Sequence, residues 1–266
     1  MKEFSKIFRS LFLIINLNTW FITFLTIIAT FLCDYFQFIG DLPITLIGTA
    51  IIFPVVFSIN SAYKRREDAI MYYASLKANW LGIFMASKNW ADKNQAYFRD
   101  TMSNELITSI QLMHDYFLQD PEKYRNLDER IYQKFDAISI LIQELRQVGV
   151  TPSELSRIDQ YLTRGINDYE KLRTIFIYRT PNSLRTYSKF FIYTFPILYA
   201  PYFAHHLKDG REIIGYVSAL LYSFVFVSLI NIQDQLENPF DQVGEDDIEF
   251  DIEEFEKMLQ GITRRK

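Results

Sequence analysis

The chain alternates between long uncharged runs and segments rich in charge. Four runs lack Asp, Glu, Lys and Arg altogether, at residues 10–33, 42–63, 190–204 and 213–233. Because a helix rises about 1.5 Å per residue, about 20 apolar residues cross a hydrocarbon core about 30 Å thick. The third run contains Pro196 and Pro201, so we expect a kinked or interrupted helix there. The pattern predicts an all-α protein with four transmembrane helices.

Charges beside these runs predict how the chain is oriented in a membrane. Basic residues precede the first run and follow the second at Lys64, Arg65 and Arg66, whereas the only charges in residues 34–41 are acidic. Positive charge flanks membrane helices on the cytoplasmic side. The amino terminus is therefore expected in the cytoplasm, and four spans return the carboxyl terminus there. We expect a multi-pass protein of the cell membrane with both termini cytoplasmic.

Residues 64–186 contain no run that could span a bilayer, and their apolar positions recur at helical spacing. The clearest stripe advances by three or four residues at a time: Leu127, Ile131, Phe135, Ile138, Ile142 and Leu145. Such stripes are typical of amphipathic helices in water. A capping box of Thr151 and Glu154 marks one helix start. We expect helices at 64–92, 95–118, 121–148 and 152–178, the first of them continuing the second membrane helix.

These patterns divide the chain into four parts. We expect a first transmembrane hairpin at 1–63, a cytosolic helical domain at 64–186, a second hairpin at 187–233 and an acidic cytosolic tail at 234–266. Large apolar residues interleave with the acids of the tail, and a disordered tail would hold fewer of them. We therefore expect the tail to lie against the cytosolic helices, of this subunit or of a neighbour. A solvated acidic tail is the alternative.

One face of the second run carries Thr49, Phe53 and Phe57, spaced at i, i+4 and i+8. Side chains at this spacing stack on one side of a helix. The face either packs against other helices and lipid or lines a pore, and periodicity alone favours packing.

Composition and charge narrow the function. Hydrophobic residues make up 49% and charged residues 23%, which indicates one part in lipid and one in water. The net charge of −4 gives no support for a nucleic-acid partner. Cys33 is alone, so no internal disulfide forms, and the three histidines lack the spacing of a zinc site.

No pattern of catalytic residues is present in the sequence. There is no nucleophile and base arrangement, no glycine-rich phosphate loop and no carboxylate pair within a span, so an enzyme is unsupported. One group of oxygen ligands in the tail fits a hard cation such as calcium, although acidic tails are usually solvated. It comprises Asn238, Asp246, Asp247 and Glu249.

Three segments resemble the bestrophin family, more its bacterial and plant-like branch than the animal one. The segment from Phe57 to Ala69 is similar to the one that follows the pore neck of the family, with Ser58 in place of Arg and Asp68 in place of Glu. The segment from Tyr178 to Pro196 looks like the family's entry into its third span. Residues 235–240 followed by 244–247 resemble its Asn-Pro-Phe-Gly-Glu-Asp-Asp tail signature. The resemblance covers nearly the whole chain.

The resemblance implies a homopentameric ion channel that usually conducts anions. Five copies of the second span would line a hydrophobic neck, whose residues in this sequence would be Thr49, Phe53 and Phe57. The electropositive edges of phenylalanine rings favour an anion, and an apolar ring can gate by dewetting. The implied partners are membrane lipid, chloride or other small ions, and further copies of the chain. A second, cytosolic constriction would fall near Ile158 to Leu162 by position alone.

The sequence departs from the family in ways that bear on calcium and on the ion. The calcium positions of gated members would be Gln235, Asn238, Asp246 and Glu249. An apparent insertion at 241–243 shifts half of these positions, which argues against calcium gating. Calcium is the one cofactor that the resemblance suggests, and the sequence does not establish it. Thr49 is polar where the family is usually aliphatic. A cation-conducting channel and a non-conducting membrane scaffold stay open as alternatives.

Overall fold

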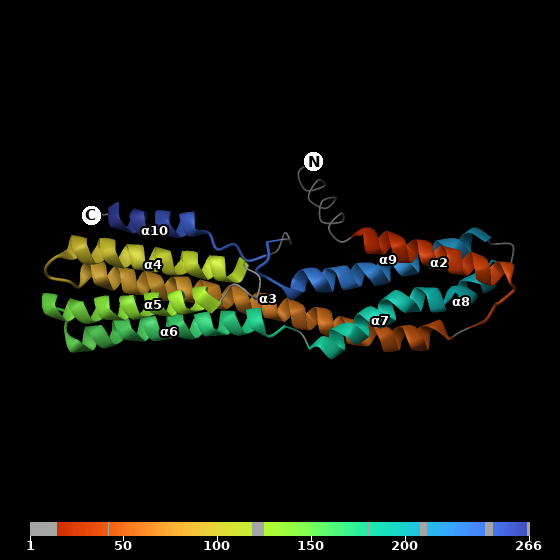
Figure 1. Cartoon of the computed structure of the whole chain (residues 1–266), viewed down its shortest axis with the longest axis horizontal. Coiled ribbons are helices and arrows are strands. Elements are labelled where there is room, and N and C mark those ends of the chain that lie inside the picture. Colours follow the sequence, from red (N-terminus) through yellow and green to blue (C-terminus); the bar gives the residue numbers. More distant parts are fainter. Residues whose placement is uncertain are drawn as a thin grey trace. The chain divides into compact units, whose positions relative to one another are not determined.

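The structure is a computed structural model that describes residues 15–41, 43–118, 125–179, 181–207, 212–242 and 247–264. Every regular element among these residues is a helix, and no strand occurs among them, in agreement with the predicted all-α class (Figure 1). The elements are α2 (Leu17–Tyr35), α3 (Ile44–Asn89), α4 (Gln95–Leu118), α5 (Arg125–Glu144), η1 (Leu145–Val148), α6 (Pro152–Ile177), α7 (Asn182–Leu198), α8 (Ala200–His205), α9 (Glu212–Glu237) and α10 (Ile252–Arg264).

The chain forms two compact units. Unit 1 comprises residues 1–66, 179–238 and 243–246, and unit 2 comprises residues 67–178, 239–242 and 247–266. Unit 1 therefore holds α2, α7, α8, α9 and the first part of α3. Unit 2 holds the rest of α3 with α4, α5, α6 and α10.

Helix α2 of unit 1 turns a polar face inward and an aromatic face outward. Threonines one turn apart are buried at Thr19, Thr23, Thr26 and Thr30, and the helix packs on α8 and α9. The Asn231 side chain on α9 donates to the Thr19 hydroxyl at 2.9 Å, and Ser223 donates to Thr23 at 3.2 Å. The other face exposes Trp20, Phe24 and Phe31.

The first apolar run does not form one helix from residue 10 to 33. Residues 10–14 lie outside the described part of the chain, and Asn16 is extended, with φ −97° and ψ 177°. Its side chain accepts a hydrogen bond from the Thr19 amide and donates to Asn231 at 3.0 Å. Asparagine is a favoured N-cap because its oxygen satisfies an orphan amide. This cap, within an uncharged run, is why α2 begins at Leu17.

The third apolar run is interrupted, as the two prolines predict. Helix α7 ends at Leu198, Tyr199 leaves the helical conformation with ψ near 2°, and α8 begins at Ala200. Proline lacks the amide that would extend the hydrogen-bond ladder, so Pro196 and Pro201 weaken the helix on both sides of the break. Tyr199 bridges the interruption, since its hydroxyl donates to the Pro43 carbonyl at 3.4 Å.

Two described helices are long and apolar enough to cross a membrane, Leu17–Tyr35 and Ile213–Glu237. The two further spans expected from the sequence, in α3 and in the interrupted α7 and α8, are not among them. The count of four spans stays a prediction.

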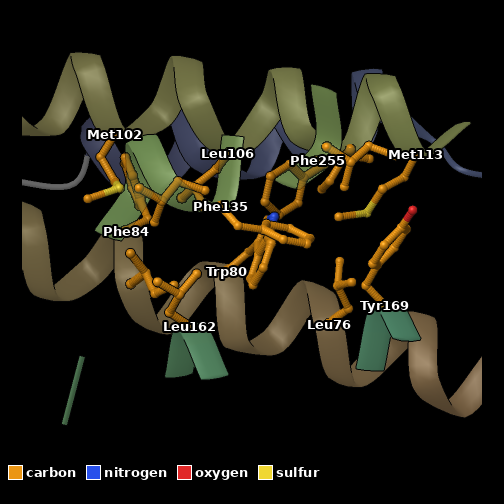
Figure 2. Close-up of a cluster of buried hydrophobic side chains, with 14 of the residues drawn as sticks. Leu76, Trp80, Phe84, Met102, Leu106, Met113, Phe135, Leu162, Tyr169 and Phe255 are labelled. Atoms are coloured by element: carbon orange, nitrogen blue, oxygen red, sulfur yellow. The ribbon is translucent and has the colours of Figure 1, made fainter. Parts of the chain in front are cut away.

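Unit 2 is a helical bundle with a continuous apolar core. Trp80 of α3 is fully buried at its centre, with its indole Nε1 donating to the Ser109 hydroxyl at 2.9 Å (Figure 2). Gly165 of α6 makes room for this ring, because a Cβ there would meet the indole at 1.8 Å. The stripe predicted between Leu127 and Leu145 faces this core, which confirms its amphipathic assignment.

The helix boundaries of unit 2 follow the predicted signals with small shifts. Both hydrogen bonds of the Thr151 and Glu154 capping box form. Gly149 ends the preceding helix at φ +103°, a conformation that suits glycine. The last four residues of that helix, Leu145–Val148, tighten into a 3₁₀ turn. Its predicted start at residue 121 lies outside the described residues. The helix predicted at 64–92 is the second part of α3 and ends at Asn89 rather than at 92.

The acidic tail packs on unit 2 instead of being solvated. Phe240, Phe250 and Phe255 join its core, and the Phe240 and Phe117 rings stack with centroids 4.5 Å apart. Among the described acids between these rings, Glu249, Asp251, Glu253 and Glu254 are exposed. Helix α10 packs on α4 and is held at its far end by the Lys88 ammonium, which donates to the Ile262 carbonyl at 2.7 Å. The tail therefore packs on the helices of unit 2 in the same chain, as predicted, and the cytosolic location of these helices stays a prediction.

Candidate functional site: the exposed face of α3

The first part of α3 presents two different faces. Ile51, Val55 and Ser58 are buried, and the first two join an apolar cluster with residues of α7 and α9. Gly48 lets α9 approach closely, because a Cβ there would lie 2.9 Å from the Tyr222 hydroxyl. This buried face fixes the rotation of α3 within unit 1 and so decides which residues are left outside.

The opposite face carries the three residues that the sequence singles out. Thr49 is exposed, and Phe53 and Phe57 are 57% and 60% exposed. The two rings lie one turn apart with centroids separated by 6.1 Å. The Thr49 hydroxyl donates to the Thr45 carbonyl at 2.6 Å, so its hydrogen is used within the helix and its methyl group adds to the apolar face.

Sequence reasoning missed two members of this face. Ile52 and Val56 are 38% and 52% exposed beside the phenylalanines. We call the five residues Thr49, Ile52, Phe53, Val56 and Phe57 the α3 stripe. Helical spacing could have found both: Ile52 lies three residues after Thr49, and Val56 lies four residues after Ile52. Residues at these spacings widen a helical face beyond a single line.

The calcium candidates are only partly described. Asp246 lies outside the described residues, Gln235 and Asn238 are half-buried in unit 1, and Glu249 is exposed in unit 2. Among the residues that the structure describes, no three His, Cys, Asp or Glu side chains gather as a metal site would require. The Pro239 carbonyl accepts a hydrogen bond from the Ile248 amide at 2.8 Å.

The suggested cytosolic constriction at Ile158 to Leu162 is wrong for its two apolar ends. Ile158 and Leu162 are buried in the core of unit 2, where they pack among apolar side chains of the bundle. The residues that face outward in this turn of α6 are Asp159, Gln160 and Thr163. Position along the chain alone does not predict which face of α6 is exposed.

Ion pairs gather at one end of unit 1, where α7 begins and α9 ends, which we call the basal end. Arg185 of α7 lies 3.1 Å from the Glu237 carboxylate of α9, which is 4% exposed. One turn further along α7, Lys189 lies 2.7 Å from Asp234. These pairs fix the register of α7 against α9.

Comparison with known proteins supports the fold. No protein-family model and no curated protein matches the sequence. Among solved structures, a variant of a bacterial bestrophin homologue from Klebsiella pneumoniae is similar with a TM-score of 0.77 and 17% identity, over 93% of this chain and 98% of that one. A second variant gives a TM-score of 0.78 at 17% identity, over 92% and 96%. A chain described as a membrane protein gives 0.76 at 17% identity, over 93% and 98%. The chain therefore has the fold of the bacterial bestrophin homologues.

Proposed function

We propose that this protein is a bestrophin-like ion channel of the cell membrane that passes anions, chloride above all, through a neck lined by α3. In this proposal five copies assemble around the neck, and both termini lie in the cytoplasm. The observation that carries the proposal is the α3 stripe, an apolar face left uncovered on a helix whose other face is fully packed.

The surface of unit 1 supports a membrane setting. Helix α2 buries threonines and exposes Trp20 at 61% and Phe24 at 62%, the reverse of a helix that packs in water. In hydrocarbon, exposed aromatic rings need no cover, whereas hydroxyl groups need partners inside the protein. The hydrogen bonds that link Asn16, Thr19 and Asn231 supply such partners.

The chemistry of the α3 stripe suits an ion neck. Its members offer methyl groups and ring edges but no charge, so a ring of five stripes forms an apolar constriction. A narrow apolar constriction can exclude water and thereby gate, and the positive edges of Phe53 and Phe57 favour an anion that passes them. The fold shared with bestrophin homologues supports the same arrangement of α3.

Reconstitution tests the neck directly. The protein is placed in lipid bilayers under a potassium chloride gradient, and the reversal potential is measured for wild type and for F53A, F57A and the double variant. We expect a reversal potential near that of chloride, and a severalfold higher conductance in the double variant because the constriction widens.

A matched control separates the neck from the lipid surface. Phe24 and Phe31 of α2 are 62% and 54% exposed, close to the values for Phe53 and Phe57. The variants F24A and F31A are expected to leave conductance unchanged. If the α2 variants and the α3 variants change the conductance equally, or if F53A and F57A leave the currents unchanged, α3 does not line the neck.

Two further outcomes address the alternatives. A reversal potential near that of potassium would make the protein a cation channel with the same neck. The mass of the protein in detergent is expected at five times the 31.6 kDa of one chain. A monomer or dimer without conductance would favour a non-conducting scaffold.

A further inference from the structure

Three buried polar side chains near the basal end of unit 1 have no partner among the described residues. The Ser58 hydroxyl of α3, the Ser188 hydroxyl of α7 and both amide atoms of Gln233 in α9 accept and donate no hydrogen bond there. Their residues are 0%, 1% and 1% exposed. Buried polar groups in proteins nearly always have a partner, which is protein, water or an ion.

The two serines differ from five other hydroxyl-bearing residues of the same unit, although the Ser228 hydroxyl of α9 also has no partner among the described residues. Thr26, Thr30, Thr49, Thr194 and Ser223 each donate to the carbonyl four residues earlier in their own helix. Ser58 and Ser188 make no such bond. Because both are fully buried within the unit, their hydroxyl groups face the space between helices and stay available to a ligand there.

The known contacts place these groups at neighbouring levels of unit 1. Lys189 pairs with Asp234 and Arg185 with Glu237, so Ser188 and Gln233 lie in the register that these ion pairs set. Each of the three residues also lies about one helical turn from a member of the apolar cluster. Ser58 follows Val55, Ser188 precedes Ile192, and Gln233 follows Ile230. The three therefore form a polar layer at the basal edge of the cluster.

Basic side chains gather around a buried carboxylate at this end of unit 1. Arg65 and Arg185 both interact with Glu237, and Arg179 acts electrostatically on Arg65. Burial lowers the pKa of the Arg65 guanidinium, Glu237 opposes that shift, and Arg179 adds to it. The guanidinium groups of Arg65 and Arg185 contribute a positive field that attracts an anion, and Lys189 with Asp234 adds no net charge.

We propose that Ser58, Ser188 and Gln233 bind a small monovalent anion, a halide such as chloride, inside each subunit. Two hydroxyl groups and an amide N–H are the donors that a desolvated halide needs, and the arginines balance its charge. The site lies on the buried side of α3, whereas the α3 stripe lies on the exposed side. It holds α3, α7 and α9 together and does not depend on conduction.

Thermal unfolding of the full-length protein in detergent tests the site. The melting temperature is measured as sodium gluconate is replaced by sodium chloride or bromide at constant ionic strength. We expect the halides to raise it by about 3 °C at tenfold saturation, since a ligand that binds only the folded state stabilises it by mass action. The variants Q233L and S58A/S188A are expected to lose this rise.

Two control variants show whether the halide effect is specific to the proposed site. Ser223 is equally buried on α9, but its hydroxyl has partners at Thr23 and Ala219, so S223A is expected to keep the halide-dependent rise. F53A/F57A is expected to keep it as well, even where conductance changes. A rise that persists in Q233L, or one lost in S223A or F53A/F57A, overturns the assignment.

Crystals of the wild-type protein grown in bromide test the site even if the variants do not fold. Wild-type crystals grown in bromide are expected to show an anomalous peak within hydrogen-bond distance of Ser58, Ser188 and Gln233. Density without anomalous signal there means that water alone bridges the groups, and it overturns the halide site. Neither result bears on whether the α3 stripe conducts, which the reversal potential decides separately.

Discussion

Helix α2 of unit 1 and the helices of unit 2 bury opposite kinds of side chain. In α2 of unit 1 the inward positions are Thr19, Thr23, Thr26 and Thr30, and the outward ones are aromatic. In unit 2 the inward positions include Trp80, Tyr116 and Phe255, and acids interleave on the outside. A helix in water hides its apolar face, whereas one in hydrocarbon gains nothing by doing so.

The contrast changes what holds each unit together. Unit 2 gains from apolar burial, so cavities and overpacking in its core are expected to matter most. Unit 1 relies on close packing and on hydrogen bonds such as that between Asn231 and Thr19. In the proposed membrane setting its individual polar contacts are expected to contribute less, because side chains also find partners when helices separate within a membrane.

The largest effect is expected from truncating a core aromatic ring of unit 2. Phe255 of α10 is 1% exposed, and F255A is expected to destabilise the docked tail by about 3–5 kcal/mol, the usual range for a buried phenylalanine. The measurement is limited proteolysis of α10 together with the melting temperature. Met258 on the same helix is 38% exposed, so M258A is the control. An α10 that stays protected in F255A would show that other contacts hold the tail.

A smaller effect is expected from filling the space that Gly165 leaves for Trp80. In G165A the new Cβ meets the indole at 1.8 Å, and the fully buried ring cannot move away freely. Overpacking of this kind typically costs about 1–3 kcal/mol, against a gain of about 1 kcal/mol in helix propensity. Gly261 of α10 has open space around its Cβ position, so G261A is expected to raise the melting temperature. Stabilisation by both variants would mean that the indole relocates without loss.

Local signals in the sequence predicted unit 2 well. The stripe from Leu127 to Leu145, the Thr151 capping box and the apolar residues of the tail are each visible among residues close in the chain, and the structure confirms each packing or cap that they predict. Ile158 and Leu162 were assigned to a constriction by position alone. They are buried, because the face that α6 exposes depends on how Gly165 and Trp80 pack.

Unit 1 was harder to predict because its polar contacts join distant parts of the chain. The side chain of the N-cap residue Asn16 is held by a hydrogen bond to Asn231, which is 215 positions away. The uncharged run around Asn16 therefore contains no local sign of where the helix begins. The α3 stripe was visible in part, since Thr49, Phe53 and Phe57 follow helical spacing. The burial of Ser58, Ser188 and Gln233 depends on how helices from separate segments of the chain pack together, which no local pattern records.

The smallest effects are expected from replacing one buried serine by alanine in each unit. Ser109 in unit 2 and Ser223 in unit 1 are each 0% exposed. S109A leaves the Trp80 Nε1 donor without its acceptor in a dry core, which is expected to cost about 1–3 kcal/mol. S223A removes one partner of Thr23, and membrane hydrogen bonds average only about 0.6 kcal/mol. Melting temperatures of the two variants, measured in one detergent, are expected to fall more for S109A. An equal fall would mean that unit 1 is held together by the same forces as unit 2, and it would weaken the case that its surface lies in lipid.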